Sequence, residues 1–117
     1  MIARLMGLRV LSPADLRQRL ESREPIAVLD VNARPSWLAA RIPGARHLDP
    51  QAFSAADLPA EPDRPLVFYC SNPLCRKAPQ AARRALAMGY RDVRVLAAGI
   101  TGWRAAGMPV ESGEPAR

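Results

Sequence analysis

The sequence predicts an α/β fold, with an open and mostly parallel sheet of about five strands and helices on both faces. Apolar segments of strand length alternate along the chain with segments of helical pattern, and the connections between them are short. Two of the apolar segments, at 26–31 and 66–70, contain almost no polar residue, which is typical of strands buried on both faces of a parallel sheet. These patterns place helices on both sides of a single sheet.

Each element has a local signal. The expected strands lie at 8–11, 26–31, 46–48, 66–70 and 93–96. The expected helices lie at 13–21, within 32–40 and at 77–88, with a further turn or helix starting at 98–103. Ser12 followed by Pro13 has the composition of a helix N-cap and a proline at the first helical position. Gly89 stands where a left-handed residue commonly closes a helix, and the polar segment 111–117 is expected to be a flexible tail.

The length and composition fit one domain covering residues 1–117. The chain is 49% hydrophobic, enough for one modest core, and its charged fraction of 24% excludes a disordered chain. No apolar run approaches the roughly 20 residues of a membrane-spanning helix. The start, MIARLMGLRV, has neither a sustained apolar stretch nor a small-residue cleavage site. We therefore expect a cytoplasmic domain without a membrane partner.

The charge balance favours anionic partners. There are 17 basic and 11 acidic residues, giving a net charge of +6. The basic residues are scattered from Arg4 to Arg117 rather than gathered with aromatic residues on one stripe, so we expect small anions rather than nucleic acid. With two cysteines and one histidine, a zinc site would also need carboxylates, and we expect no metal. In a reducing cytosol, so few cysteines are more often reactive than structural.

The chemistry is concentrated between the strand at 66–70 and the helix at 77–88. Cys70 ends the strand, and in such sheets the ligand lies beyond the carboxyl ends of the strands. Backbone amides, a helix N-terminus, Arg76 and Lys77 all favour the thiolate, so we expect the pKa of Cys70 to lie below the ordinary thiol value of about 8.5. Cys70 is thus the predicted nucleophile, and the alternative is a small buried residue that finishes a strand.

The order of motifs resembles the single-domain rhodanese family through nearly the whole chain. The matching segments are LSPADLRQRL, VLDVNARPSWLAARIPGA, VFYC, Ala81-Ala82 before Gly89-Tyr90, and AGITGWRAAGMPVESG. The resemblance implies a three-layer α/β fold and a sulfurtransferase that needs no cofactor. In such an enzyme, Cys70 would take a sulfane sulfur from thiosulfate or a persulfide donor, hold it as a persulfide, and pass it to a thiol or cyanide acceptor.

The site that follows from this resemblance surrounds Cys70. Arg76 and Lys77 are expected to attract the small anionic sulfur donor. The amides expected to form an anion cradle belong to Ser71, Asn72, Leu74, Cys75 and Arg76. Cys75 is also a candidate resolving thiol, with a loop residue in place of a glycine as the alternative. Spacing alone does not decide between these roles, and Pro73 stiffens the loop and could hold the two thiols apart.

The loop departs from the usual rhodanese pattern of a cysteine, four residues, an arginine and then serine or threonine. Here five residues separate Cys70 from Arg76, and Lys77 replaces the hydroxyl residue. The five-residue spacing is similar to that of cell-cycle phosphatases and some arsenate reductases, whose longer loop holds a tetrahedral oxyanion. Such an enzyme, with Arg76 as clamp, is the alternative function. A third hypothesis is a non-catalytic interaction module, against which the retained cysteine argues.

Three further positions carry expectations. Asn32 and Arg41 replace an arginine and a histidine of the family pattern, and neither has a catalytic role in the transfer. Asp30, at the end of a buried strand, either anchors the neighbouring loops or is an ordinary solvated carboxylate. His47 has no partner motif and is expected to be a surface or hydrogen-bonded histidine rather than a base.

Overall fold

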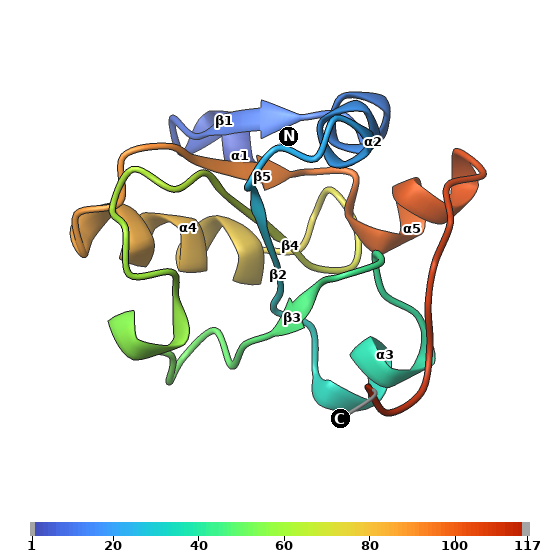
Figure 1. Cartoon of the computed structure of the whole chain (residues 1–117). Helices are drawn as coiled ribbons and strands as arrows, with labels where there is room; N and C mark the ends of the chain where they lie inside the picture. Colours follow the sequence, from blue (N-terminus) through green and yellow to red (C-terminus); the bar gives the residue numbers. More distant parts are fainter. Residues whose placement is uncertain (1, 116–117) are drawn as a thin grey trace.

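A computed structural model, which describes residues 2–115, shows one five-stranded sheet with all strands parallel (Figure 1). The strands, in the spatial order β1-β5-β4-β2-β3, are β1 (Arg9–Leu11), β5 (Val93–Leu96), β4 (Leu66–Tyr69), β2 (Ala27–Asp30) and β3 (Arg46–His47). The predicted parallel α/β sheet is confirmed. The strand that ends at the candidate nucleophile lies at its centre.

Residues 2–115 also contain five helices and one 3-10 turn, which precede, connect or follow the strands. They are α1 (Ile2–Leu5), α2 (Pro13–Glu21), α3 (Arg34–Ala39), η1 (Ala55–Asp57), α4 (Lys77–Ala87) and α5 (Gly99–Ala105). The predicted start of α2 is confirmed, because Pro13 is its first residue and the Ser12 side chain accepts a hydrogen bond from the Asp15 amide at 3.1 Å. Within residues 2–115, no helix has both the length and the apolar character that crossing a bilayer requires.

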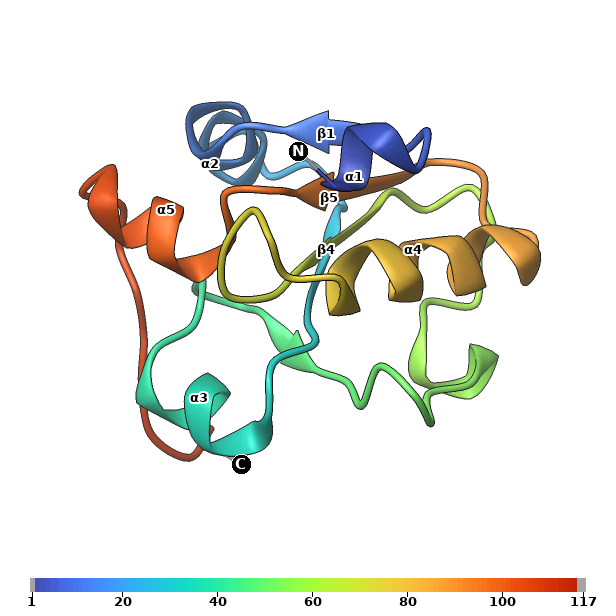
Figure 2. The same ribbon diagram turned by 180° about the vertical axis from the view of Figure 1, so that it is seen from behind.

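Two apolar clusters sandwich the sheet and make it the middle of three layers (Figure 2). Alternate residues of β4 point to opposite faces. Phe68 packs in the cluster that contains residues of α1 and α4, and Tyr69 packs in the cluster that contains residues of α2 and α5. All four residues of β4 are buried, as the apolar run at 66–70 predicts. The buried face of α4 is rich in alanine, whose small side chain lets this helix lie close to the sheet. The loop after Cys70 therefore leads directly into a helix that packs on the core.

The segment after α5 differs from expectation. We predicted a flexible tail over 111–117, but residues 111–114 are hydrogen bonded to the body of the domain. Glu111 exchanges two backbone hydrogen bonds of 2.9 Å with Arg41. The buried Arg41 guanidinium stacks 4.1 Å over the Trp37 ring and donates to the Gly113 carbonyl at 2.9 Å. Residues 116–117 lie outside the described part of the chain. Long-range contacts through one buried arginine therefore hold a segment whose composition indicates a tail.

Candidate active site

Cys70 follows the last residue of β4 and lies at the carboxyl edge of the sheet, with its residue only 3% exposed. The loop after it leads into the first turn of α4, whose amino end therefore points toward this region. Two backbone amides of α5 hold the start of the loop. Ile100 donates to the Cys70 carbonyl at 2.9 Å, and Thr101 donates to the Ser71 carbonyl at 3.0 Å. The predicted nucleophile thus has a fixed backbone between three elements.

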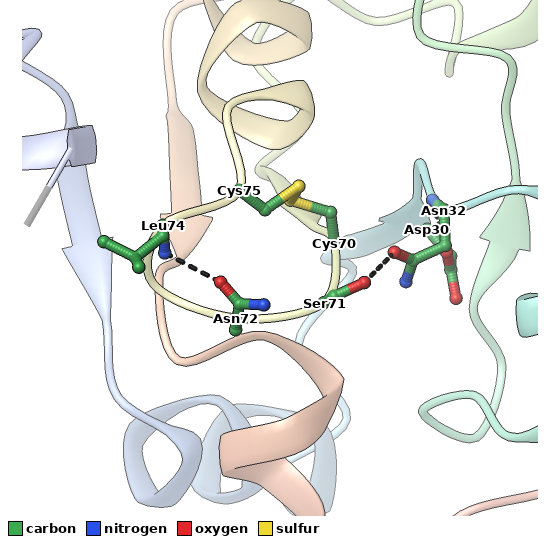
Figure 3. Close-up of a disulfide and its surroundings, with 7 residues drawn as sticks. All are labelled: Asp30, Asn32, Cys70, Ser71, Asn72, Leu74 and Cys75. Atoms are coloured by element: carbon green, nitrogen blue, oxygen red, sulfur yellow. Dashed lines mark hydrogen bonds between the residues drawn. A yellow bond between two sulfur atoms is a disulfide. The ribbon is translucent and has the colours of Figure 1, made fainter.

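Cys70 is bonded to Cys75 in a disulfide, with 6.4 Å between the two Cα atoms (Figure 3). The chain returns to Cys75 through a β-turn, in which the Cys75 amide donates to the Asn72 carbonyl at 3.1 Å. Pro73 is the second residue of this turn, a position that its fixed φ favours. Pro73 therefore helps to bring the two thiols together, whereas the sequence left open that it holds them apart.

The same turn occupies two of the five amides expected in the anion cradle. The Leu74 amide donates to Asn72 Oδ1 at 2.9 Å, and the Cys75 amide is the donor that closes the turn. Within the described residues, the amides of Ser71, Asn72 and Arg76 have no hydrogen-bond acceptor. The space beside the disulfide is about 10 Å³, close to the minimum for a single water molecule. A thiosulfate or phosphate group therefore needs an opened loop.

Gly99 is a site residue that the sequence analysis missed. It is the first residue of α5 and has a φ of +66°. A Cβ atom at this position would lie 2.5 Å from both the carbonyl carbon and the oxygen of Ser71, closer than real Cβ contacts allow. Only glycine lets α5 approach the loop in this way. The available signal was a glycine between a strand and a helix, which alone does not specify what it touches.

Asp30 is fully buried at the end of β2 and anchors two chain segments. Its Oδ2 accepts a hydrogen bond from the Tyr69 hydroxyl at 2.6 Å, and its Oδ1 accepts from the Asn32 amide at 2.9 Å. Burial raises the pKa of Asp30, although both hydrogen bonds act in the opposite direction. Burial and the neighbouring Asp30 likewise raise the pKa of Tyr69. The anchoring role is confirmed, and the alternative of a solvated carboxylate is wrong.

Asn32 links the buried Asp30 to the loop that follows Cys70. Its buried side chain accepts a hydrogen bond from the Ser71 hydroxyl at 2.8 Å (Figure 3). Its carbonyl oxygen lies 2.7 Å from His47 Nε2. Because a carbonyl can only accept, Nε2 is the donor, and His47 is a hydrogen-bonded histidine as predicted. The residue that replaces an arginine of the family pattern thus ties the carboxyl end of β2 to the residue after Cys70.

The two expected cations lie on the open side of the site. Arg76 and Lys77 are both exposed, and neither forms an ion pair within residues 2–115. Lys77 lines a cleft of about 440 Å³ together with Asn32, Arg34 and His47. This cleft is large enough for a small anion and its acceptor, and it adjoins the loop through Asn32. The structure thus places Lys77 beside this cleft and leaves Arg76 exposed at the start of α4.

The fold and this site define an α/β domain with a cysteine loop at the carboxyl edge of a parallel sheet. The family model of the rhodanese-like domain matches residues 12–106. The chain therefore belongs to the rhodanese-like domain family, as its motifs indicate.

Three relatives place the domain among known proteins. The HTH-type transcriptional regulator Rv0324 of Mycobacterium tuberculosis is 39% identical over 104 residues, covering 87% of this chain and 44% of that protein. The chain thus spans less than half of this relative. A thiosulfate sulfurtransferase from Pseudomonas aeruginosa shares the fold with a TM-score of 0.82 and 21% identity, over 92% of this chain and 21% of that chain. The protein RPA3614 of Rhodopseudomonas palustris, described as a possible tyrosine phosphatase, has a TM-score of 0.72 and 25% identity over 90% of this chain and 86% of its own.

Proposed function

We propose that the protein is a sulfurtransferase in which Cys70 carries a sulfane sulfur. The observation that supports this most directly is the place of Cys70, at the end of the central strand and before the amino end of α4, in a rhodanese-like domain. The Cys70 thiolate attacks the outer sulfur of thiosulfate. The S–S bond of the donor breaks, sulfite leaves with the electron pair, and Cys70 holds a persulfide.

The surroundings of Cys70 suit this step once the disulfide is reduced. The amino end of α4 and the Arg76 guanidinium favour both the thiolate and the anionic donor. Lys77 adds a second positive charge at the mouth of the adjoining cleft. The likeness to a thiosulfate sulfurtransferase supports the same class of donor, and the acceptor is a thiol or cyanide.

The alternative is an arsenate reductase or phosphatase-like enzyme with Cys70 as nucleophile and Arg76 as clamp. The five-residue spacing between them and the likeness to a protein described as a possible tyrosine phosphatase favour it. A non-catalytic module is the third hypothesis, and the likeness to part of a transcriptional regulator favours it.

Mass spectrometry after thiosulfate treatment of the reduced protein tests the proposal. We expect one added sulfur on the peptide that contains Cys70, and none on the Cys70→Ser variant. Turnover of an aryl phosphate or of arsenate, without sulfur uptake, would establish the alternative instead. A protein inert toward all of these reagents would be the non-catalytic module.

A pair of charge variants tests how the donor is held. We expect Arg76→Ala to lower kcat/KM for thiosulfate more than Lys77→Ala, because guanidinium grips an oxyanion through two parallel hydrogen bonds while ammonium acts as a point charge. The loss of one charge-assisted hydrogen bond, about 1.5–3 kcal/mol, corresponds to roughly tenfold to 100-fold. Equal losses in the two variants would show that only the total charge matters.

A further inference from the structure

We propose that Cys75 is a built-in acceptor: it attacks the Cys70 persulfide, closes the Cys70–Cys75 disulfide and releases the sulfane sulfur as hydrosulfide. This inference rests on the proposed function, because it requires that Cys70 first be loaded with sulfur. It adds an activity, the reductive release of hydrosulfide from thiosulfate sulfur. The cycle also needs a co-reactant, an external dithiol that reopens the disulfide.

The loop holds Cys75 where this attack needs it. The Cα atoms of the two cysteines are 6.4 Å apart, within the range of about 4.4–6.8 Å that a disulfide requires. The turn from Asn72 to Cys75 sets this separation through the Cys75 amide and through the Asn72 side chain, which accepts from Leu74. In Figure 3 the two sulfur atoms meet on the α4 side of the loop, and Leu74 points away from them. The hydrogen bonds of this turn thus hold the Cys75 thiol next to Cys70.

The two steps balance in atoms and electrons. In the first, the Cys70 thiolate and thiosulfate give the Cys70 persulfide anion and sulfite. In the second, the Cys75 thiol loses its proton and its sulfur bonds to Cys70 Sγ, while the bond from Cys70 Sγ to the outer sulfur breaks. The outer sulfur takes the electron pair of that bond and the proton of Cys75, and leaves as hydrosulfide. Cys75 is oxidised, and the outer sulfur is reduced.

The space around the sulfurs favours an internal acceptor over a bulky external one. Cys70 is 3% exposed, and the cavity beside it is about 10 Å³, lined by residues of the loop, α1, α4 and the end of β5. A large thiol can reach the persulfide only if the loop moves. Cys75 already belongs to the wall of this cavity, so it needs no further opening. The geometry therefore gives Cys75 an advantage of proximity.

Reopening of the disulfide has a preferred direction. Cys75 is partly exposed whereas Cys70 is buried, so an incoming thiolate reaches Cys75 first. Attack on Cys75 Sγ makes Cys70 the leaving group, and the amino end of α4 with Arg76 stabilises the departing thiolate. The second thiol of the dithiol then displaces Cys75 and leaves as a disulfide. This returns both cysteines to the reduced state and the nucleophile to its active form.

A single-turnover experiment with the full chain tests the inference. The reduced protein, freed of reductant and kept without oxygen, is mixed with excess thiosulfate, and sulfite, hydrosulfide and the Cys70–Cys75 peptide are measured. For the wild type we expect one sulfite, one hydrosulfide and one disulfide per chain, and continued hydrosulfide production when dithiothreitol is present. The release rate should not depend on protein concentration, since the acceptor is internal.

Two variants make the result specific. Cys75→Ser keeps the backbone amide but not the thiol, so we expect it to release sulfite and to accumulate the Cys70 persulfide without hydrosulfide. Pro73→Ala keeps both thiols but loosens the turn. A proline that fits its native conformation stabilises it by about 0.4–1 kcal/mol. We therefore expect this variant to release hydrosulfide roughly twofold to fivefold more slowly and to form the same final disulfide.

The outcomes separate the two proposals. If neither protein releases sulfite or gains sulfur, the proposed function fails, and this inference fails with it. If both proteins load Cys70 and both release hydrosulfide at the same rate, or neither does, the sulfurtransferase stands and the role of Cys75 is refuted. Hydrosulfide from the wild type alone, accompanied by the disulfide, supports the internal acceptor.

Discussion

A methyl group added at Gly99 would press on the loop that follows Cys70, and Gly107 offers a matched control. Both glycines have positive φ, +66° and +75°, so an alanine is strained at either position. At Gly99 the new Cβ would lie 2.5 Å from the Ser71 carbonyl, while at Gly107 no atom lies within 4 Å. The Gly107→Ala variant therefore carries the backbone strain alone. The Gly99→Ala variant carries the same strain and a collision with the residue after Cys70.

The expected magnitudes follow from these contacts. A left-handed conformation costs an alanine about 1–2 kcal/mol, and this strain alone lowers Tm by roughly 4–16 °C in both variants. To reach ordinary contact, Ser71 must in addition retreat by about 1 Å, and a displacement of that size at a reacting group costs on the order of 100-fold in rate. We therefore expect sulfite release by the reduced Gly99→Ala protein to slow by about 100-fold. The Gly107→Ala protein should release sulfite at the wild-type rate.

Two measurements check this reasoning. Thermal unfolding followed by circular dichroism gives Tm for each variant, and single-turnover sulfite release is then measured well below the lowest Tm. Equal rates in the two glycine variants would refute the claim that the first turn of α5 positions the loop. A slow Gly107→Ala protein would show that backbone strain near α5, rather than contact with Ser71, controls the rate of sulfite release.

Two further changes test the supports of the domain. Arg41→Ala removes the buried guanidinium that stacks on Trp37 and donates to the Gly113 carbonyl. We expect denaturant unfolding to show a free energy of unfolding lower by about 2–3 kcal/mol, which Arg41→Lys restores only in part. An unchanged denaturation midpoint would contradict this. Asp30→Asn removes a carboxyl whose pKa is raised by burial, so the fold favours its protonated form. This stabilisation of the wild type is complete below the ordinary pKa of 3.8 and is lost as pH rises through the raised value. As pH rises from 4 to 7, the free energy of unfolding of the wild type should therefore fall relative to that of Asp30→Asn. A difference between the two proteins that does not change with pH would contradict the raised pKa of Asp30.

The elements that could be predicted from the sequence are those with local signals. The strand at 93–96 has the predicted bounds, and α2 begins at Pro13 because Ser12 caps it. Short elements such as α1, with four residues, have too few positions for a hydrophobic period to show. The segment 111–114 was misjudged for a different reason. Its partner is the buried Arg41, 70 residues away in the chain, which composition does not reveal.

The site shows the same division. The place of Cys70 follows from the local order of strand, loop and helix, and the exposure of Arg76 and Lys77 follows from their position at the start of α4. The contacts of Gly99 and Asn32 with Ser71 join segments that lie far apart in sequence. No pattern within either segment specifies these contacts, because they arise from the parallel pairing of the strands.

The extra length of the loop bears on which chemistry it serves. The similarity of the five-residue spacing to that of cell-cycle phosphatases and some arsenate reductases implies a wider cradle suited to a tetrahedral anion. In the structure, that length forms the turn that returns Cys75 to Cys70, and the turn takes up the amides of Leu74 and Cys75. Anion binding by all five amides and closure of the disulfide therefore require different conformations of the same loop. An alternation between these two conformations is what a persulfide carrier with an internal acceptor needs: open to load sulfur from an anion, and closed to release it.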